Sequence, residues 1–489
     1  MIAGFQDSMK LRWGGFALWW AWWDLFRFSD AHLLPLEGGS GLIQIDRFVM
    51  EGAFLVVCLA MLVGRRRFVG FCLSPRWTGG ACALAVAGTL LFYLAGYVSV
   101  PLVSVTSCMA IGYASGYFFF AYFTCFAYDP QCRIELVAPF CLLADGLIML
   151  LFCVAHFFVP SIALAVLHCL MPLTVLLLLG DAQHAAVANA AGKPPVDDPA
   201  HPLIFPKSLM ASLFVYGFMF GFILNIVPAE PPSFPLPLIS DEGDDHVATV
   251  LEVIGCISGA LIFLVFALRS RGHDRYLSLR FAVTPFVCFA ILSLPVFGDI
   301  CISLSKMIMW TGYEYLDLIM MVIYTRTARS WPANPLTTNA QGQAADVAGI
   351  VAGMGISFAL FGNGSAPFGD REWSLIVAVV AIALFVVTMW LMTDRNIETL
   401  WGLAKRDPIA LNQERHQQRV AIFAERFGLT ARETEVLSDL LLMRKPDLVA
   451  EKQTVSVRTI RYHIGNIYTK ADVHSLVDLV KRFDELTEG

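Results

Sequence analysis

Two apolar stretches of the chain contain charged and aromatic side chains at helical spacing, a combination that can hold a small organic molecule. In residues 14–34, four of them follow i, i+3, i+4, i+7 spacing and share one helix face: Trp20, Trp23, Asp24 and Arg27. In residues 301–325, an i, i+4, i+7, i+11 spacing places Lys306, Trp310, Tyr313 and Asp317 on one helix face, with Glu314 next to Tyr313. An aromatic box with carboxylates suits a ligand with a ring or a cationic end.

These side chains also have structural interpretations. Asp24 with Arg27, and Lys306 with Asp317, can form ion pairs that lock helices, and tryptophan near the end of a membrane helix is a common interfacial anchor. The ionisable groups of other apolar stretches are interpreted as local structural partners: Asp145, His156, His168 and Glu252.

A second chemically informative stretch lies near the C-terminus and is basic. Residues 452–471 contain no acid and four basic side chains: Lys452, Arg458, Arg461 and Lys470. A helix over 457–470 would bury Ile460, Ile464 and Ile467 and expose Arg458, Arg461 and Tyr462. Such a helix can enter the major groove of DNA.

Three more helices are predicted around this basic helix. Thr430 and Glu433 form a capping box at the start of the first helix, whose buried stripe is Val436, Leu437, Leu440 and Leu441. Pro446 suits the first turn of a second helix over 446–453, and Ser456 is a good N-cap for the third helix. A fourth helix is expected over about residues 474–486.

Composition separates this tail from the rest of the chain. The 489 residues are 57% apolar and 15% charged, whereas a soluble domain has about 25% charged residues. Residues 396–489 hold 14 of the 34 Lys and Arg and 14 of the 40 Asp and Glu. The sequence therefore predicts a membrane domain over 1–395, a linker over 396–425 and a soluble domain over 426–489.

Cysteine usage and motif content argue against chemistry on a metal or cofactor. All 12 cysteines precede residue 302, and no Cys-x-x-Cys pair occurs. Their scatter along apolar runs favours small core residues over a metal site or disulfides. There is no Ser-His-Asp spacing and no phosphate-cradling loop, so we expect no enzyme activity and no cofactor.

The membrane domain contains twelve apolar runs, each long enough for a membrane span. They cover about 14–34, 47–64, 80–100, 102–126, 135–158, 160–180, 208–228, 247–268, 279–298, 301–325, 346–364 and 373–393. Two pairs of glycines, Gly217 with Gly221 and Gly349 with Gly353, have the spacing of close helix packing.

The connections between spans decide the orientation, because Lys and Arg stay in the cytoplasm. The even-numbered connections carry Arg65, Arg66, Arg67, Arg76, Arg133, Lys193, Lys207, Arg269, Arg271, Arg275, Arg326 and Arg329. The odd-numbered ones carry only Arg47 and Arg371. Both termini and the 181–206 connection are therefore expected in the cytoplasm.

The connection at 181–206 divides the spans six and six, a layout that resembles the major facilitator superfamily. The resemblance implies an all-α bundle whose spans one, four, seven and ten line a cavity. Span four would add Tyr113 and Tyr117 to the aromatic and charged residues above, and span seven would add Tyr216 and Asn225. Of the superfamily's signature between spans two and three, only the positive charge remains, at Arg65, Arg66 and Arg67.

The tail resembles the four-helix, helix-turn-helix DNA-binding domain of LuxR-type transcriptional regulators. Matching positions are Leu429, Thr430, Arg432, Glu433, Glu435, Val436, Leu437, Ala450, Ser456, Thr459, Ile460, His463, Asn466, Ile467, Lys470 and Val473. The resemblance implies phosphate or base contacts by Thr459, Arg461, His463 and Lys470, to which the outward Arg458 and Tyr462 are added. It also implies a homodimer through the fourth helix. The chain departs from the family at Met443, where the family has Gly, and at Gln453, where it has Leu.

Together these features predict a membrane-embedded one-component transcriptional regulator in a bacterial inner (cytoplasmic) membrane. The bundle would sense a small molecule or a membrane state among the lipids, and the tail would bind DNA. One alternative is a major-facilitator-type transporter with an appended regulatory domain. Another is a membrane scaffold whose tail binds a protein.

Overall fold

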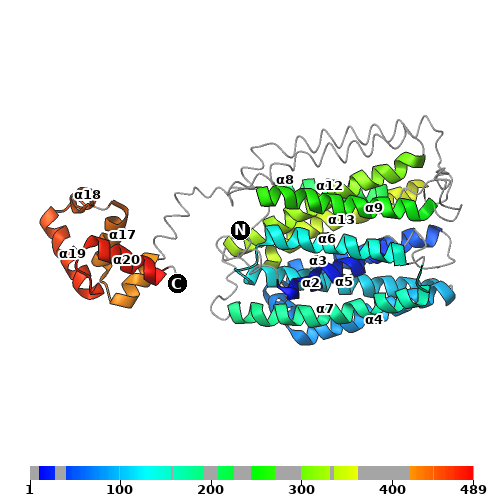
Figure 1. The fold of residues 1–489 in the computed structure, drawn as a ribbon, viewed down its shortest axis with the longest axis horizontal. Helices are drawn as coiled ribbons and strands as arrows, with labels where there is room; N and C mark the ends of the chain where they lie inside the picture. Colours follow the sequence, from blue (N-terminus) through cyan, green and yellow to red (C-terminus); the bar gives the residue numbers. More distant parts are fainter. Residues whose placement is uncertain are drawn as a thin grey trace. The chain divides into compact units, whose positions relative to one another are not determined.

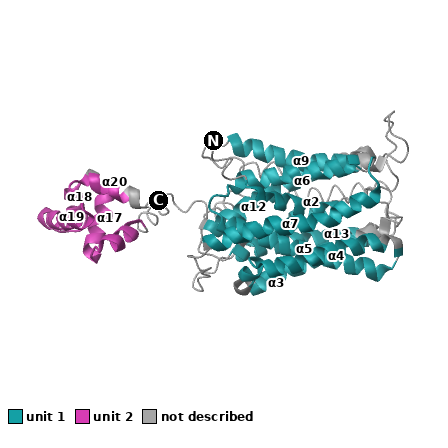
Figure 2. Cartoon of the chain, turned by 60° about the horizontal axis from the view of Figure 1, so that its bottom comes forward, with its two compact units in different colours: residues 1–397 teal, residues 398–489 magenta. Residues whose placement is uncertain are grey.

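The computed structural model describes residues 10–27, 40–98, 100–155, 158–190, 207–224, 244–269, 299–330, 335–361, 419–443 and 445–487. The chain divides into two compact units, Met1–Ile397 and Glu398–Gly489 (Figure 2). The regular structure of the described residues is helical, and no strand occurs among them.

The first unit is a bundle of long helices that run roughly alongside one another (Figure 1). A short 3-10 turn, η1 (Leu11–Trp13), precedes α2 (Gly14–Arg27), α3 (Ser40–Cys72), α4 (Pro75–Val98), α5 (Pro101–Tyr128), α6 (Ile134–Ala155), α7 (Ser161–Ala190), α8 (Lys207–Leu224), α9 (Asp244–Arg269), α12 (Asp299–Ser330) and α13 (Pro335–Phe361). Ten of the twelve predicted spans fall on these helices. The spans predicted over 279–298 and 373–393 lie outside the described residues.

Most of these helices can cross a membrane. Seven described helices are long and apolar enough to do so, and α8 contains a shorter apolar stretch, Leu209–Phe222. Large apolar side chains such as Ile162 and Leu177 are exposed on the bundle surface, where lipid would cover them. Helices also satisfy every backbone hydrogen bond internally, as the bilayer requires. The chain is a multi-pass membrane protein.

Helix α2 is the buried centre of the first half of the bundle. All of its residues except Gly14 and Leu18 are buried, and Trp19 and Trp22 donate indole hydrogen bonds to Ser115 of α5 and Thr89 of α4. The interpretation of these tryptophans as interfacial anchors is therefore wrong, because they lie inside the protein.

Helices pack against each other both across the two halves of the bundle and within each half. Across the halves, α3 packs on α13 and α6 packs on α9; within the second half, α8 packs on α13 and α9 on α12. The α8–α13 contact is made at the two predicted glycine pairs. A Cβ atom built on Gly217 would lie 2.1 Å from the carbonyl oxygen of Asp346, and one on Gly353 would lie 2.0 Å from that of Phe218. The prediction of close packing is confirmed.

The second unit is a small helical domain. A helical segment at 419–427 leads into α17 (Ala431–Met443), α18 (Pro446–Lys452), α19 (Val457–Ala471) and α20 (Leu476–Thr487). The core combines apolar side chains from all of them, including Val420 and Phe423 from the stretch predicted as linker. The four predicted helices are confirmed, with ends that differ by a few residues.

Candidate functional site

The surface of α19 is built as the sequence predicts. The hydroxyl of Ser456 accepts a hydrogen bond from the backbone N–H of Thr459 at 3.1 Å, which starts the helix as an N-cap. Ile460, Ile464 and Ile467 are buried in the domain core. On the opposite side Tyr462 is 67% exposed, and Arg458 and Arg461 are also exposed. The helix therefore presents two guanidinium groups and an aromatic ring to the solvent.

The turn before α19 is held by α17. Asp439 of α17 accepts hydrogen bonds from Lys452 at 2.6 Å and from the side-chain amide of Gln453 at 2.7 Å. Thr454, inside the turn, adopts a left-handed φ of 54°. Gln453, where the family has Leu, thus fixes the end of α18 through a polar contact. The α18-turn-α19 unit keeps a defined geometry despite this departure.

Lys470 has a role inside the domain. Its ammonium donates to Glu433 Oε2 at 2.6 Å and to the carbonyl oxygen of Gly428 at 3.0 Å. Glu433 also completes the predicted capping box, since it accepts from Thr430 N at 2.8 Å while Thr430 Oγ1 accepts from Glu433 N at 3.3 Å. The hydrogen bond from Lys470, followed by that from Thr430, lowers the pKa of Glu433 to about 2. Lys470 therefore ties the end of α19 to the start of α17.

The other residues predicted to contact DNA lie nearer than Lys470 to the start of α19. The hydroxyl of Thr459 is 2.8 Å from that of Ser456. His463 is partly buried, with its ring 5.7 Å from that of Tyr462. Arg461 approaches Asp447 of α18 only to 3.9 Å, and both side chains are more than 70% exposed. Such an exposed pair contributes little, so Arg461 is available to another anion.

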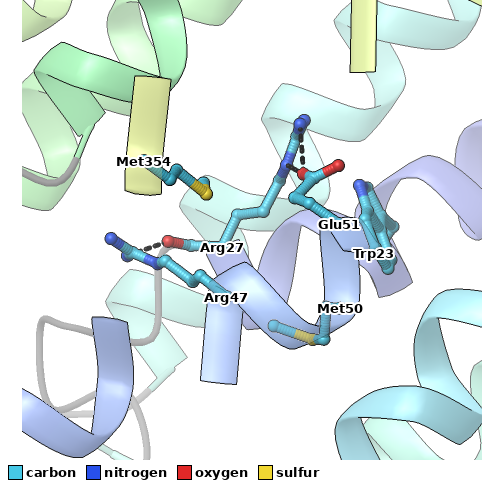
Figure 3. A pocket seen from close by; sticks show the side chains of 6 residues that line it. All are labelled: Trp23, Arg27, Arg47, Met50, Glu51 and Met354. Carbon is cyan, nitrogen blue, oxygen red and sulfur yellow. Dashed lines mark hydrogen bonds and ion pairs between the residues drawn. The ribbon is translucent and has the colours of Figure 1, made fainter. Parts of the chain in front are cut away.

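The second candidate site lies in the membrane bundle, around Arg27 at the end of α2. Its Nη2 and Nε lie 2.8 and 3.1 Å from Glu51 Oε1 of α3. Nη1 lies 3.5 Å from Asp24 Oδ1, so the predicted Asp24–Arg27 ion pair is present. The Arg27 carbonyl oxygen accepts a hydrogen bond from Arg47 (Figure 3).

Three aromatic rings from three helices complete this site. The Arg27 guanidinium carbon lies 5.7, 5.5 and 5.9 Å from the ring centroids of Trp23, Phe220 and Trp310, within the range of cation–π attraction. We call these three rings with Asp24, Arg27 and Glu51 the Arg27 cluster. A small pocket next to it is lined by Trp23, Arg27, Arg47, Met50, Glu51 and Met354 (Figure 3).

The structure brings many, but not all, of the predicted ligand-box residues to this cluster. Tyr313 stacks on Phe220 at 3.9 Å and donates a hydrogen bond to Asp346 at 2.8 Å. Glu314 and Asp317 lie close enough to Asp24 and Arg27 to interact electrostatically. Three spans predicted to line a cavity, α2, α8 and α12, therefore meet here.

The remaining predicted residues lie elsewhere or are not described. Tyr117 bonds to Thr78 of α4 and to the Phe71 carbonyl oxygen of α3, within the first half of the bundle. Trp20 is buried against Phe16 and Trp19, Tyr113 is half-buried on α5, and Tyr216 is buried on α8. Asn225 and the side chain of Lys306 lie outside the described residues, as does the Lys306–Asp317 pair.

Several buried groups at the cluster were not predicted as site residues. The sequence pattern does not predict a site role for Glu51 or Asp346, and it favours a local structural role for Asp145. Each is an ionisable residue within an apolar run, which is the signal that could have found them. Glu252, also predicted to be a local structural partner, accepts a hydrogen bond from the Trp310 indole at 3.3 Å. The ring nitrogens of His168 are hydrogen-bonded to the Tyr93 hydroxyl and to the Trp22 carbonyl oxygen. His156 lies outside the described residues.

The described cysteines and the possible metal-binding side chains form no further candidate site. The cysteines that the structure describes are buried and free, which confirms their interpretation as core residues. Among the described residues, no group of His, Cys, Asp or Glu side chains has a metal-binding arrangement.

Comparisons with known proteins concern both units. The chain is similar to solved structures of a mutant nucleoside transporter NupG (17% identity, 80% of this chain and 100% of that chain, TM-score 0.49), the human organic anion transporter MFSD10 (12%, 78% and 99%, 0.47) and the Major Facilitator Superfamily transporter FucP (14%, 79% and 100%, 0.44). No curated protein matches the sequence. Residues 428–483, from the end of the 419–427 helix to α20, match the model of the family described as bacterial regulatory proteins, luxR family, which confirms the resemblance predicted for the tail.

Proposed function

We propose that the protein is a membrane-embedded one-component transcriptional regulator, whose bundle senses a small molecule or a membrane state and whose C-terminal domain binds DNA as a dimer through α20. One observation carries the proposal: a LuxR-type domain with an exposed, basic α19 belongs to the same chain as a multi-pass membrane bundle. We place both termini in the cytoplasm of a bacterium, on the basis of the Lys and Arg distribution.

The DNA-binding part is supported by the surface of α19. Arg458, Arg461 and Tyr462 are exposed at the position where a recognition helix reads base edges. Arginine is the side chain that most often makes a two-pronged contact with guanine. An exposed recognition helix of this kind would give sequence preference even though residues 396–489 carry equal numbers of acidic and basic side chains.

Selection from a random duplex DNA library tests this part. Residues 398–489 form the second compact unit, and we expect that fragment to enrich a defined motif. Arg461→Ala should weaken binding to the enriched motif by ~1–3 kcal/mol and broaden it. Arg432→Ala is the matched control, because Arg432 lies on α17 and makes an exposed pair with Glu435. If low salt also gives no enriched motif, DNA reading by this domain is refuted.

The sensing part is supported by the Arg27 cluster. It places buried charge and aromatic rings at the contact of α2, α3, α8 and α12, where a ligand would favour one arrangement of the helices over another. We expect Asp317→Asn to abolish the transcriptional response and to leave DNA binding by the C-terminal domain unchanged. Membrane abundance is measured alongside reporter output. Normal abundance with a lost response supports sensing here, and a parallel loss of both contradicts it.

A further inference from the structure

Buried acids outnumber buried bases around the Arg27 cluster. The buried arginines that the structure describes in the bundle are Arg12, Arg27 and Arg47, and Arg12 is paired with Asp129 at 2.5 Å. Among the residues of the bundle that the structure describes, the buried carboxylates other than Asp129 are Asp24, Glu51, Asp145, Glu252, Glu314 and Asp346. Glu51 has Arg27, Glu252 has Trp310, and Asp346 has Tyr313. The remaining group is Asp24, Asp145 and Glu314, which we call the acidic triad; within it Asp24 shares Arg27 with Glu51, at a longer distance of 3.5 Å.

The acidic triad is both buried and short of partners. The three residues are 0%, 1% and 1% exposed, and they come from α2, α6 and α12. Both carboxylate oxygens of Asp24, Oδ1 of Asp145 and Oε2 of Glu314 have no hydrogen-bond partner. Asp145 lies within electrostatic range of Asp24 and Glu314, and Glu314 within range of Asp24. A buried charge without a partner is strongly unfavourable, so this arrangement calls for a positive charge.

The geometry distinguishes between kinds of positive charge. Among the described residues, no group of three or more His, Cys, Asp or Glu side chains could hold a metal ion, so the triad is not a metal site. An ammonium has three N–H donors and a guanidinium has five, so either can reach several separated acceptors. The rings of Trp23, Phe220 and Trp310 already surround one guanidinium, that of Arg27. The walls next to the triad therefore suit an organic cation.

We propose that the acidic triad binds the cationic end of an organic amine or guanidine, and that Arg27 is the tethered cation that borders this site. The proposal rests on the proposed sensing function and names the chemical class of its ligand. Arg27 is held by Glu51 through two contacts of 2.8 and 3.1 Å, and by Asp24 through one of 3.5 Å. An incoming cation can take Asp24 while Arg27 stays on Glu51. The ligand then draws α2, α6 and α12 together.

The test is a direct binding measurement on the purified full-length protein in detergent, without DNA. The probes are benzylammonium, butylammonium and benzylguanidinium, with benzyl alcohol as the neutral partner of nearly equal shape. We expect at least one cation to raise the unfolding temperature by about 2 °C or more at saturation, and benzyl alcohol to leave it unchanged. Changes in tryptophan fluorescence give the affinity, since Trp23 and Trp310 border the site.

Two neutralising variants separate a ligand site from a structural role. Asp145→Asn and Glu314→Gln should weaken the binding of the cation at least about tenfold. The same variants should unfold at a higher temperature than the wild type without ligand, because each neutralises a buried carboxylate that has one oxygen without a hydrogen-bond partner. Asp129→Asn is the matched control: it breaks the Arg12 pair, so it should unfold at a lower temperature and keep the cation response.

Three results would overturn the proposal. The first is that no cation stabilises the wild type more than benzyl alcohol does. The second is that both triad variants keep the response to the cation. The third is that both variants destabilise the ligand-free protein. None of these readouts involves DNA, so the proposal can fail while a DNA motif is still enriched. Conversely, a cation can bind here even if the C-terminal domain reads no DNA.

Discussion

The contact between Glu433 and Lys470 should control the stability of the C-terminal domain. Glu433 is 5% exposed and accepts from Lys470 and from Thr430 N. The pKa falls from 4.5 to about 2, and at ~1.4 kcal/mol per unit this corresponds to at most ~3 kcal/mol. Lys470 is 33% exposed, so solvent screening reduces the contribution to about 1–2 kcal/mol.

Two substitutions divide this contribution into its parts. Glu433→Gln keeps a side chain that can complete a capping box but loses the charge facing Lys470. It should lower the free energy of unfolding of residues 398–489 by about 1–2 kcal/mol at pH 7, or the melting temperature by roughly 5–10 °C. Glu433→Ala also removes the cap and should cost about 1 kcal/mol more. Glu435→Gln, at an exposed pair with Arg432, is the control and should change stability by under about 0.5 kcal/mol.

The pH dependence gives an independent check. The pKa of Glu433 is lower in the folded state, so the stabilisation is complete above about pH 4.5 and disappears as the pH falls towards 2. Circular dichroism during denaturant unfolding measures the stability of wild type and Glu433→Gln from pH 7 to 2. Their difference should be constant above pH 5 and approach zero at pH 2. A difference that is absent at pH 7, or unchanged throughout, refutes the reasoning.

Three further predictions concern other parts of the molecule. Arg458→Ala should reduce the salt dependence of binding to the enriched DNA motif by about one unit of log–log slope if this exposed side chain contacts a phosphate; an unchanged slope in a salt titration would exclude that contact. Alkaline phosphatase fused near residue 240 should be active and a fusion within 181–206 inactive, because the Lys and Arg distribution puts only the first outside; the reverse pattern would overturn the topology. Gly349→Val should reduce the amount of folded protein in the membrane, because a Cβ atom there would lie 2.1 Å from the Phe214 carbonyl oxygen. Gly355→Ala should be tolerated, because the nearest atom of another residue to a Cβ atom built there is 3.5 Å away. Equal abundance of the two variants would contradict the packing.

Sequence periodicity predicts well which side of a helix a residue lies on, but it predicts poorly which residue of another helix it contacts. It identified the buried isoleucines of α19, the cap at Ser456 and the glycine pairs of α8 and α13, because each depends on neighbours within a few residues. It also placed Asp24 and Arg27 on one face of α2. It could not show that Glu51 is the main partner of Arg27, because that contact depends on how α3 packs against α2.

The same limit applies to Tyr117 and Lys470. The position of Tyr117 on span four was compatible with a central cavity, yet its hydroxyl bonds to Thr78 and the Phe71 carbonyl oxygen. Lys470 was expected to face DNA, and its ammonium also reaches Glu433, 37 residues earlier in the chain. Contacts across such distances arise from tertiary packing, which the spacing of residues in one helix does not encode.

The glycine contact between α8 and α13 restricts how the second half of the bundle can move. At the four glycines, backbone atoms of one helix lie directly against the other, with little side-chain volume between them. We therefore expect α8 and α13 to move together when the bundle rearranges. Asp346 lies at this contact and holds Tyr313 of α12, while α13 also packs on α3. Any rearrangement at the Arg27 cluster that tilts α13 must carry α8 with it.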